Sequence, residues 1–437
     1  MSKFSVWTFG CRCNQADSAA LREGLCRHSM CEAGNHLDAD LVIINSCTVT
    51  HRSDQQVRQA VRRVHRENPG ARVVVTGCYA ERDPETLAAI PGVTLVVGNA
   101  DRERLPEILG NLDFQTQGKI IHGALQVDRD YLVAPMTRTG GKTRPLVKLQ
   151  DGCDARCSYC IVPHVRGPGR SARTEDILAE IKSLVEAGFQ EIVLTGVHLG
   201  TYGRKIRGRL RLAGLLREII GIPGLGRIRL SSIEPMNFER EIIDIAAGSP
   251  VFARHFHIPM QSGSDRILRK MRRPHTAARF RDLLDFIQGK MPDVGLGTDV
   301  LVGFPGETED DFAETCDLIR DSPLTYLHVF PFSPREGTEA YSLPDRVSSK
   351  IVRRRMEILL DISRSKNLEF RRRFLGRVLP AITLAHEEDL GASVVLTSNY
   401  IHVRIPGLSI PPNRLIHVRL SSITLESTLG SDQNNSI

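Results

Sequence analysis

The first hundred residues alternate between short apolar runs and amphipathic segments. Residues 4–10, 40–46 and 72–77 are rich in β-branched and aromatic side chains, which is typical of buried strands. Each run is followed by a segment with helical spacing. Strands that alternate with helices predict a parallel sheet covered on both faces, and therefore a Rossmann-like N-terminal α/β domain. The helical segments are residues 17–25, 55–65 and 84–90.

A polar stretch from residue 99 to about residue 140 contains several glycines and prolines, and we interpret it as a linker. The strand–helix alternation then resumes. Residues 174–188 show the pattern clearly, because their apolar positions share one helical face between Thr174 as a cap and Gly188 as a stop. Six β/α units are fewer than the eight of a closed barrel. The expected strands are residues 145–150, 191–196, 227–233, 255–260, 297–303 and 325–331.

The last hundred residues have a different character. Residues 348–374 form a basic helical segment, and short β-rich segments separated by turns follow it. This pattern predicts a small all-β barrel, whereas the polar residues 427–437 are expected to fray. The expected strands are residues 377–384, 393–397, 400–405 and 415–424.

Composition narrows the class of protein. The chain has 437 residues, 25% of them charged, and no apolar run approaches the roughly 18 residues that a membrane span needs. The first residues contain no long apolar segment, so we expect a cytoplasmic protein without a leader and without membrane contact. The net charge is +7, and residues 351–377 contain nine lysines or arginines against three acidic residues. Such a run is often only a solvated face, yet it is also the electrostatic footprint of nucleic-acid binding.

The ten cysteines favour metal or catalytic roles over disulfides in a chain of this kind. Cys153, Cys157 and Cys160 follow the first strand of the second half at C-x3-C-x2-C spacing. Zinc prefers four ligands in two pairs, whereas three close thiolates suit a cubane iron–sulfur cluster with one iron left open. The plainer alternative is three loop cysteines without a metal.

Three further cysteines occupy equivalent positions in the first domain. Cys11, Cys47 and Cys78 each follow a predicted strand, and the carboxyl ends of parallel strands meet at one edge of a sheet. A single cysteine there would be interpreted as a small buried hydrophobe. Three at equivalent ends predict a second three-thiolate cluster. Cys13 lies two residues from Cys11 and competes with it as a ligand, whereas Cys316 in its amphipathic segment is expected in the core.

The motif around residues 153–160, with Tyr159 before the last cysteine, resembles the signature of the radical SAM superfamily. In that superfamily the open iron binds S-adenosylmethionine (SAM) and cleaves it reductively to a 5′-deoxyadenosyl radical. The segments 8–15, 45–50 and 76–80 resemble the N-terminal domain of the radical SAM methylthiotransferases, in which three such cysteines hold an auxiliary cluster that supplies sulfur. This chain departs from the usual pattern at Cys13 and Ser46, and neither change removes a ligand.

The resemblance implies two [4Fe–4S] clusters and SAM as cofactors. It also implies SAM contacts on successive strand ends, although turn or capping roles are an alternative for each one. Arg166 belongs to a basic element that resembles one in the family, in which Ala172 stands where the family has arginine. Arg166 could pair with the SAM carboxylate or a phosphate, and the alternative is an exposed basic loop. The residues implied to bind the cofactor are Tyr159, Thr195, Gly196, Ser232, Glu234, Gln261 and Phe304.

The resemblance further implies a methylthiotransferase domain at residues 1–125, a partial (β/α)6 radical SAM barrel at 139–369 and an RNA-binding TRAM domain at 370–430. Residues 45–50 look most like the branch that adds a methylthio group to C2 of N6-threonylcarbamoyladenosine next to the tRNA anticodon. Isopentenyladenosine in tRNA and a ribosomal-protein aspartate are the alternative substrates. A non-catalytic iron–sulfur RNA-binding protein is the alternative class. The implied partners are tRNA and an external electron donor, with the chain acting as a monomer.

Overall fold

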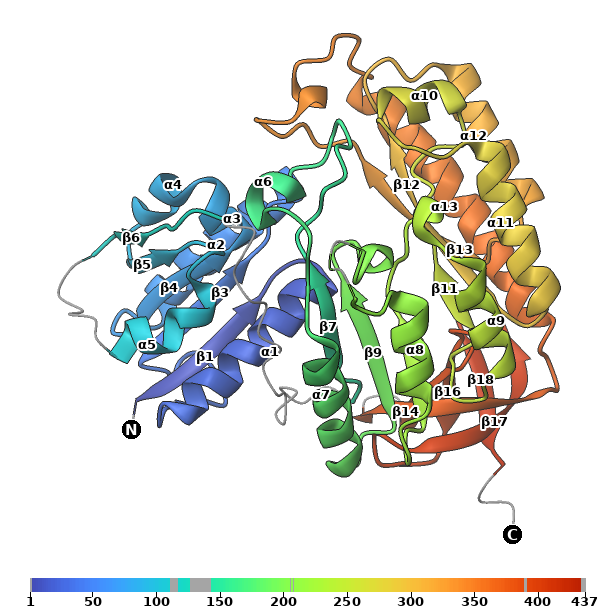
Figure 1. Ribbon diagram of the computed structural model, residues 1–437, viewed down its shortest axis with the longest axis horizontal. Helices are drawn as coiled ribbons and strands as arrows, with labels where there is room; N and C mark the ends of the chain where they lie inside the picture. The colour runs from blue at the N-terminus through green and yellow to red at the C-terminus, as the bar shows by residue number, and fades with distance from the viewer. Residues whose placement is uncertain are drawn as a thin grey trace.

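The computed structural model describes residues 2–110, 117–125, 143–204, 206, 208–388 and 391–433. It has three parts in chain order: an N-terminal α/β sheet, a central partial barrel and a C-terminal β-barrel (Figure 1). Residues 111–116 and 126–140 of the expected linker lie outside the described residues.

The N-terminal part is a parallel six-stranded sheet with strand order β2-β1-β3-β4-β5-β6. Alternate residues of β3 pack into different core clusters, Val42 and Ile44 into one and Leu41 and Ile43 into the other, so both faces are buried. The predicted parallel sheet is confirmed. Its strands are β1 (Lys3–Thr8), β2 (Cys31–Glu32), β3 (Leu41–Ser46), β4 (Arg72–Gly77), β5 (Val93–Val97) and β6 (Lys119–Ile121), and its helices are α1 (Arg12–Arg27), α2 (His51–Glu67), α3 (Cys78–Arg82), α4 (Pro84–Ala88) and α5 (Leu105–Gly110).

The interpretation of residues 99–140 as a linker was wrong in part, because β6 lies within them and extends the sheet. Two of the three residues of β6 are exposed at the sheet edge, and such a short run carries no periodic signal. The strand is defined by its backbone pairing with β5, which the residues do not reveal.

The central part contains six parallel strands in chain order. Ladders join β7 to β9, β9 to β10, β11 to β12 and β12 to β13, and the bridge between Ser232 and His257 links the two sheets. Helices cover the outer face, so the six-unit partial barrel is confirmed (Figure 1). The strands are β7 (Leu146–Asp151), β9 (Glu191–Gly196), β10 (Arg227–Leu230), β11 (His255–His257), β12 (Gly295–Val302) and β13 (Tyr326–Pro331). The main helices are α7 (Thr174–Glu186), α8 (Leu212–Ile220), α9 (Arg240–Gly248), α11 (Ala277–Lys290), α12 (Glu309–Asp321) and α13 (Ser349–Arg372), with a short α6 (Val162–Arg166), α10 (Asp265–Lys270) and an edge strand β8 (Arg170–Ser171).

The C-terminal part is a closed barrel with strand order β14-β15-β16-β18-β17, as the sequence predicts. The expectation that residues 427–437 fray was wrong for Thr428–Asp432, which form β18 and close the barrel against β17 and β16. Gly430 permits this closure, because an added Cβ would lie 2.7 Å from a methyl group of Val418. The other strands are β14 (Val378–Glu387), β15 (Ala392–Thr397), β16 (His402–Pro406) and β17 (Leu415–Ile423).

Both terminal parts pack against the central barrel. Ala16 of α1 packs with Leu146 and Val193 on β7 and β9, so the first domain covers the open side of the partial barrel. At the start of the strands, Tyr400 of the C-terminal barrel stacks on His255 with ring centroids 4.1 Å apart. In the described part of the chain, no helix combines the length and the apolar character that crossing a membrane requires.

Candidate functional site

Cys11, Cys47 and Cys78 lie together at the carboxyl edge of the N-terminal sheet. The Sγ atoms of Cys11 and Cys78 are both 3.9 Å from the same side-chain oxygen of Asn14. Gly10 has a φ of 96°, and a Cβ there would lie 2.7 Å from Sγ of Cys47. Only glycine therefore lets the two cysteine segments approach so closely. The structure brings together the three thiols that the sequence analysis grouped.

The three thiols have different acidities. Burial raises the pKa of Cys47 to about 11 and also raises the pKa of Cys78. A hydrogen bond with Cys13 lowers the pKa of Cys11 to about 6 and outweighs burial, with the Arg166 guanidinium adding to the effect. Cys13 is itself buried, and its Sγ lies 3.9 Å from Oγ1 of Thr195 on the central barrel. Cys13 therefore lies between Cys11 and the barrel.

Cys153, Cys157 and Cys160 lie in the loop between β7 and α6. Gly152 begins this loop with a φ of 69°, and a Cβ there would lie 2.0 Å from the carbonyl oxygen of Pro168. Burial raises the pKa of Cys153 to about 11 and that of Cys160 to about 12. Metals bind thiolates, so a cluster in this loop must compensate for burial with its own positive charge.

Two polar side chains that the sequence analysis missed contact this loop. Nδ1 of His198 is 3.3 Å from Sγ of Cys153, and Nη1 of Arg273 donates to Sγ of Cys157 at 3.6 Å. Arg273 is buried and pairs with Glu234. Both residues come from loops without a periodic pattern, and they reach the cysteines only through the fold. Their cationic or donor groups favour negative charge on the sulfur atoms.

The residues that the resemblance linked to SAM have varied surroundings. Thr195 is buried against Cys13, and Glu234 is held by Arg273. Ser232 is exposed, and its hydroxyl lies 2.8 Å from Nδ1 of His257.

The remaining four residues linked to SAM are buried or half-buried. Gln261 has a φ of 70°, which is uncommon for a residue other than glycine. Gly196 lies beside Gln150, and a Cβ on it would be 3.1 Å from that side chain. The side chain of Phe304 is fully buried in a small apolar cluster against which Tyr159 packs, so only its backbone remains for a ligand.

Both groups of cysteines adjoin the short helix α6. Cys78 packs against Ile161 and Val165, and Ile161 directly follows Cys160 in the chain. Nδ2 of Asn99 donates to the carbonyl oxygen of Val165 at 2.6 Å and lies 3.9 Å from Sγ of Cys78. The first cysteine group therefore packs against α6, and the second cysteine loop leads directly into this helix.

Arg166 does not have the role that the sequence analysis gave it. Its guanidinium is buried and donates to Asp151 at 2.7 Å and to Asp17 at 2.9 Å, so it holds the first domain on the barrel. The expectation that it pairs with a SAM carboxylate or a phosphate was wrong, because both terminal nitrogens of its guanidinium already donate to carboxylates of the protein. Ala172, which belongs to the same basic element, is fully buried in the barrel core.

The donor sets suit cubane clusters. The six cysteines of the two groups form no disulfide, so each group offers three thiols. Three thiolates leave one iron of a cubane open, whereas a structural zinc site would need a fourth ligand. Cys316 is buried in the barrel core, which confirms its predicted structural role.

Comparisons with known proteins agree with this architecture. Residues 147–319 match the radical SAM superfamily, and residues 3–98 match the uncharacterized protein family UPF0004. The radical S-adenosylmethionine methyltransferase TsrM from Kitasatospora setae, solved with cobalamin and a [4Fe–4S] cluster bound, has a similar fold. Its TM-score is 0.56 at 17% identity, over 78% of this chain and 77% of that one. Fold and site thus define a radical SAM protein.

Relatives with a known name identify the family within this superfamily. The threonylcarbamoyladenosine tRNA methylthiotransferase MtaB of Bacillus subtilis is 35% identical over 96% of this chain and 94% of its own length. The protein of the same name from Aquifex aeolicus is 36% identical over 93% and 97%. The tRNA-2-methylthio-N(6)-dimethylallyladenosine synthase of Pelotomaculum thermopropionicum is 32% identical over 91% and 90%. The chain belongs to the radical SAM tRNA methylthiotransferase family, which uses SAM and [4Fe–4S] clusters.

Proposed function

We propose that this chain adds a methylthio group to C2 of N6-threonylcarbamoyladenosine next to the anticodon of tRNA. The observation that carries the proposal is the pair of three-cysteine groups, one packed against α6 and one in the loop directly before it, in a chain whose MtaB relatives match it over nearly its full length. An unactivated aromatic C–H bond cannot be broken by side-chain acids and bases, so such a reaction needs cofactor chemistry.

The six cysteines have two roles in this proposal. Cys153, Cys157 and Cys160 hold the catalytic cluster, and Cys11, Cys47 and Cys78 hold the auxiliary cluster. When bound, the first cluster supplies reductive cleavage of SAM and the second supplies sulfur. Arg273 and His198 orient the loop of the first cluster through the sulfur contacts described above. Cys13 stays next to Cys11 as a buried neighbour that favours the Cys11 thiolate.

The SAM contacts are proposed for the strand ends of the barrel. Glu234 and Ser232 offer oxygen atoms, Gln261 offers an amide, and Gly196 lets the backbone approach the ligand. Thr195 and Phe304 contribute backbone atoms in this proposal, because their side chains are buried in protein contacts, and Tyr159 shields the cysteine loop. The strand-end position is the usual location of ligand sites in barrel folds.

Two other substrates share the chemistry. Isopentenyladenosine, also called dimethylallyladenosine, is the substrate that the names of several relatives contain, and those relatives are 32–34% identical to this chain. A ribosomal-protein aspartate is the other. The sequence of residues 45–50 supports threonylcarbamoyladenosine. A non-catalytic iron–sulfur protein would leave the two incomplete thiolate sets without a purpose.

The proposal extends to the setting of the enzyme. We infer a cytoplasmic monomer that takes electrons from an external donor and binds tRNA through a C-terminal TRAM domain at residues 370–430. Residues 1–125 would then form the methylthiotransferase domain and residues 139–369 the radical SAM domain. The exposed arginines of α13 and the closed β-barrel beside them support the RNA-binding role.

Anaerobic reconstitution with iron, sulfide and dithionite tests the assignment of the cysteines. Replacing Cys153, Cys157 and Cys160 by Ala is expected to halve the bound iron and to abolish SAM cleavage. Cys47→Ala is expected to retain SAM cleavage and to form no methylthio nucleoside. Cys31→Ala, a change of an exposed cysteine outside both groups, serves as the control and leaves both activities intact. Unchanged iron in the triple variant, or a methylthio product from Cys47→Ala, would contradict the assignment.

A further inference from the structure

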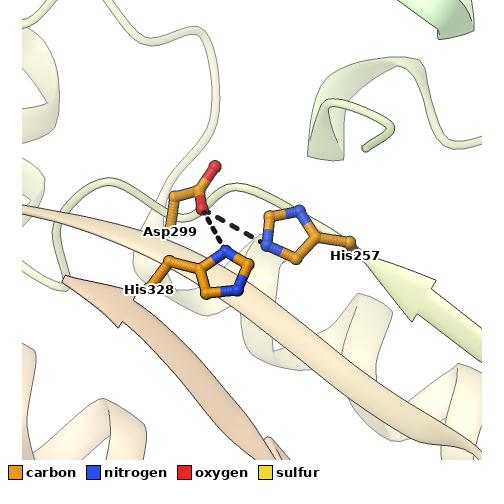
Figure 2. Close-up of side chains that lie close together, drawn as sticks. All are labelled: His257, Asp299 and His328. Carbon is orange, nitrogen blue, oxygen red and sulfur yellow. Dashed lines mark hydrogen bonds and ion pairs between the residues drawn. The ribbon is translucent and has the colours of Figure 1, made fainter. Parts of the chain in front are cut away.

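Three side chains on the inner face of the partial barrel converge next to Ser232, and none of the three has a role in the proposed function. His257 lies on β11, Asp299 on β12 and His328 on β13 (Figure 2). Successive side chains of a strand point to opposite faces. Val300 and Leu327, the chain neighbours of two members, pack into the core under the outer helices, so Asp299 and His328 point to the interior.

The polar atoms of this group are close to one another. Oδ1 of Asp299 lies 3.2 Å from Nε2 of His257 and 3.3 Å from Nδ1 of His328. All three atoms lie within 4.8 Å of one another. Nε2 of His257 is buried and makes no hydrogen bond in the described part of the chain, although it lies so near the carboxylate. A buried polar atom without a hydrogen bond needs an explanation.

A shared metal ion explains both the distances and this nitrogen. Two ligand atoms each about 2.1 Å from one ion, and about 100° apart at it, are separated by about 3.2 Å. Nδ1 of His328 is within hydrogen-bond distance of Oδ1 of Asp299, and an ion bound by both atoms would take the place of that hydrogen bond. The observed separations of 3.2 and 3.3 Å match this expectation.

The surroundings have the features of a metal site with open positions. The side chain of His257 is 8% exposed, that of Asp299 22% and that of His328 52%, so the group has a closed side and an accessible side. The other ring nitrogen of His257, Nδ1, lies 2.8 Å from the hydroxyl of Ser232. Metal-ligating histidines commonly have such a partner, which fixes the orientation of the ring.

The charge of the carboxylate also suits a cation. Burial opposes ionisation of Asp299, but the contacts with His257 and His328 outweigh it and hold the pKa of the carboxyl well below its usual range. Two imidazoles and one carboxylate are a ligand set that iron(II) and zinc use when they keep positions free for a substrate or water.

We propose that His257, Asp299 and His328 bind one divalent transition-metal ion, such as Zn²⁺ or Fe²⁺, inside the barrel, with open positions for an oxygen ligand such as a carboxylate or a hydroxyl group. This site is separate from the six cysteines. It does not depend on which nucleoside the enzyme modifies.

Zinc binding to the cluster-loaded protein tests this site. The reconstituted protein is dialysed anaerobically against buffered Zn²⁺, and bound zinc is counted by mass spectrometry. We expect one zinc per chain with wild type. Asp299→Asn and His328→Ala are expected to weaken binding at least about tenfold, because loss of even an outer-shell partner costs roughly 10- to 100-fold. His328 is half-exposed, so its replacement is compatible with folding, which circular dichroism checks. His417→Ala, at an exposed position of β17, is the control and keeps the zinc.

X-ray absorption at the zinc edge identifies the ligands. The proposal predicts nitrogen or oxygen neighbours at about 2.0–2.1 Å, with imidazole scattering and without sulfur at about 2.3 Å. Sulfur at that distance would place the zinc on cysteines and overturn the proposal. No zinc on the wild-type protein, or equal affinity in Asp299→Asn and His328→Ala, would overturn it as well. Because the readout is bound metal, its failure is distinct from failure to modify tRNA.

Discussion

The contact between the first domain and the barrel depends on a buried ionic network around Asp17. The carboxylate of Asp17 accepts from Arg166 at 2.9 Å, lies 3.1 Å from a guanidinium nitrogen of Arg102 and also pairs with Lys148. Its side chain is 2% exposed. Asp151, which shares the same three cations, is the other carboxylate of the network.

Asp17→Asn keeps the shape of the side chain and removes its charge. Three buried cations then face one carboxylate instead of two. Breaking a buried ion pair by removing one partner costs about 3–5 kcal/mol, because the remaining charges stay desolvated without compensation. We therefore expect the variant to lose about 3–5 kcal/mol of unfolding free energy. Asp317→Asn, which breaks an exposed pair with Arg320 on one helix, is expected to lose at most about 0.5 kcal/mol.

Urea unfolding at neutral pH measures this difference. The chain has a single tryptophan, Trp7 on β1, so its fluorescence reports the N-terminal sheet while circular dichroism reports the whole chain. The pKa of Asp17 is lowered in the folded protein, because the three cations outweigh burial. Its contribution is therefore present above the unfolded pKa of about 3.9 and is lost as pH falls through the lower folded pKa. A loss below about 1 kcal/mol, similar to that of Asp317→Asn, would refute this account of the interface.

Two further predictions concern α7 and tRNA binding. Burial raises the pKa of Glu180 to about 8, so the folded protein binds a proton there that the unfolded chain releases, and stability falls with pH between about 4.5 and 8. Glu180→Gln should remove up to about 1.4 kcal/mol per pH unit of that slope in urea unfolding; equal slopes in both proteins would contradict the buried carboxyl. Replacing the exposed Arg353, Arg372 and Arg377 by Gln should weaken tRNA binding. The slope of log K against log salt concentration should fall by about 0.9 for each phosphate that the variant no longer neutralises. Arg281→Gln, at an exposed position of α11, is the control and should change neither quantity. Identical binding titrations for the triple variant and for Arg281→Gln at several salt concentrations would argue against RNA binding by the basic residues 351–377.

The sequence predicted those elements whose signal is local. The strands before Cys11, Cys47 and Cys78 are rich in β-branched or aromatic residues, and parallel topology places their ends at one edge, so the cysteine group followed from the chain alone. The strands β6 and β18 were missed because each is short and is stabilised mainly by pairing with its neighbours.

The missed functional contacts join distant residues. Lys148 pairs with Asp17 across 131 positions, and Arg273 reaches Cys157 across 116. Arg166 is the clearest example of a contact that the sequence alone could not reveal. An arginine in a glycine-rich basic segment suggests an anionic ligand, and only the fold shows that two buried carboxylates already use its guanidinium.

The proposed zinc or iron(II) site could not be predicted from the sequence either. His257, Asp299 and His328 lie on three separate strands and form no motif in the sequence. Their grouping follows from the register of neighbouring strands, in which Asp299 is paired directly with His328.

The central claim is that two incomplete thiolate sets, which both adjoin α6, serve methylthiolation of threonylcarbamoyladenosine. Mass spectrometry of tRNA nucleosides from cells with and without this chain tests it most directly. Loss of the chain should remove 2-methylthio-N6-threonylcarbamoyladenosine and leave its unmethylthiolated precursor in its place. An unchanged nucleoside profile, or loss of the methylthio group from dimethylallyladenosine instead, would contradict it.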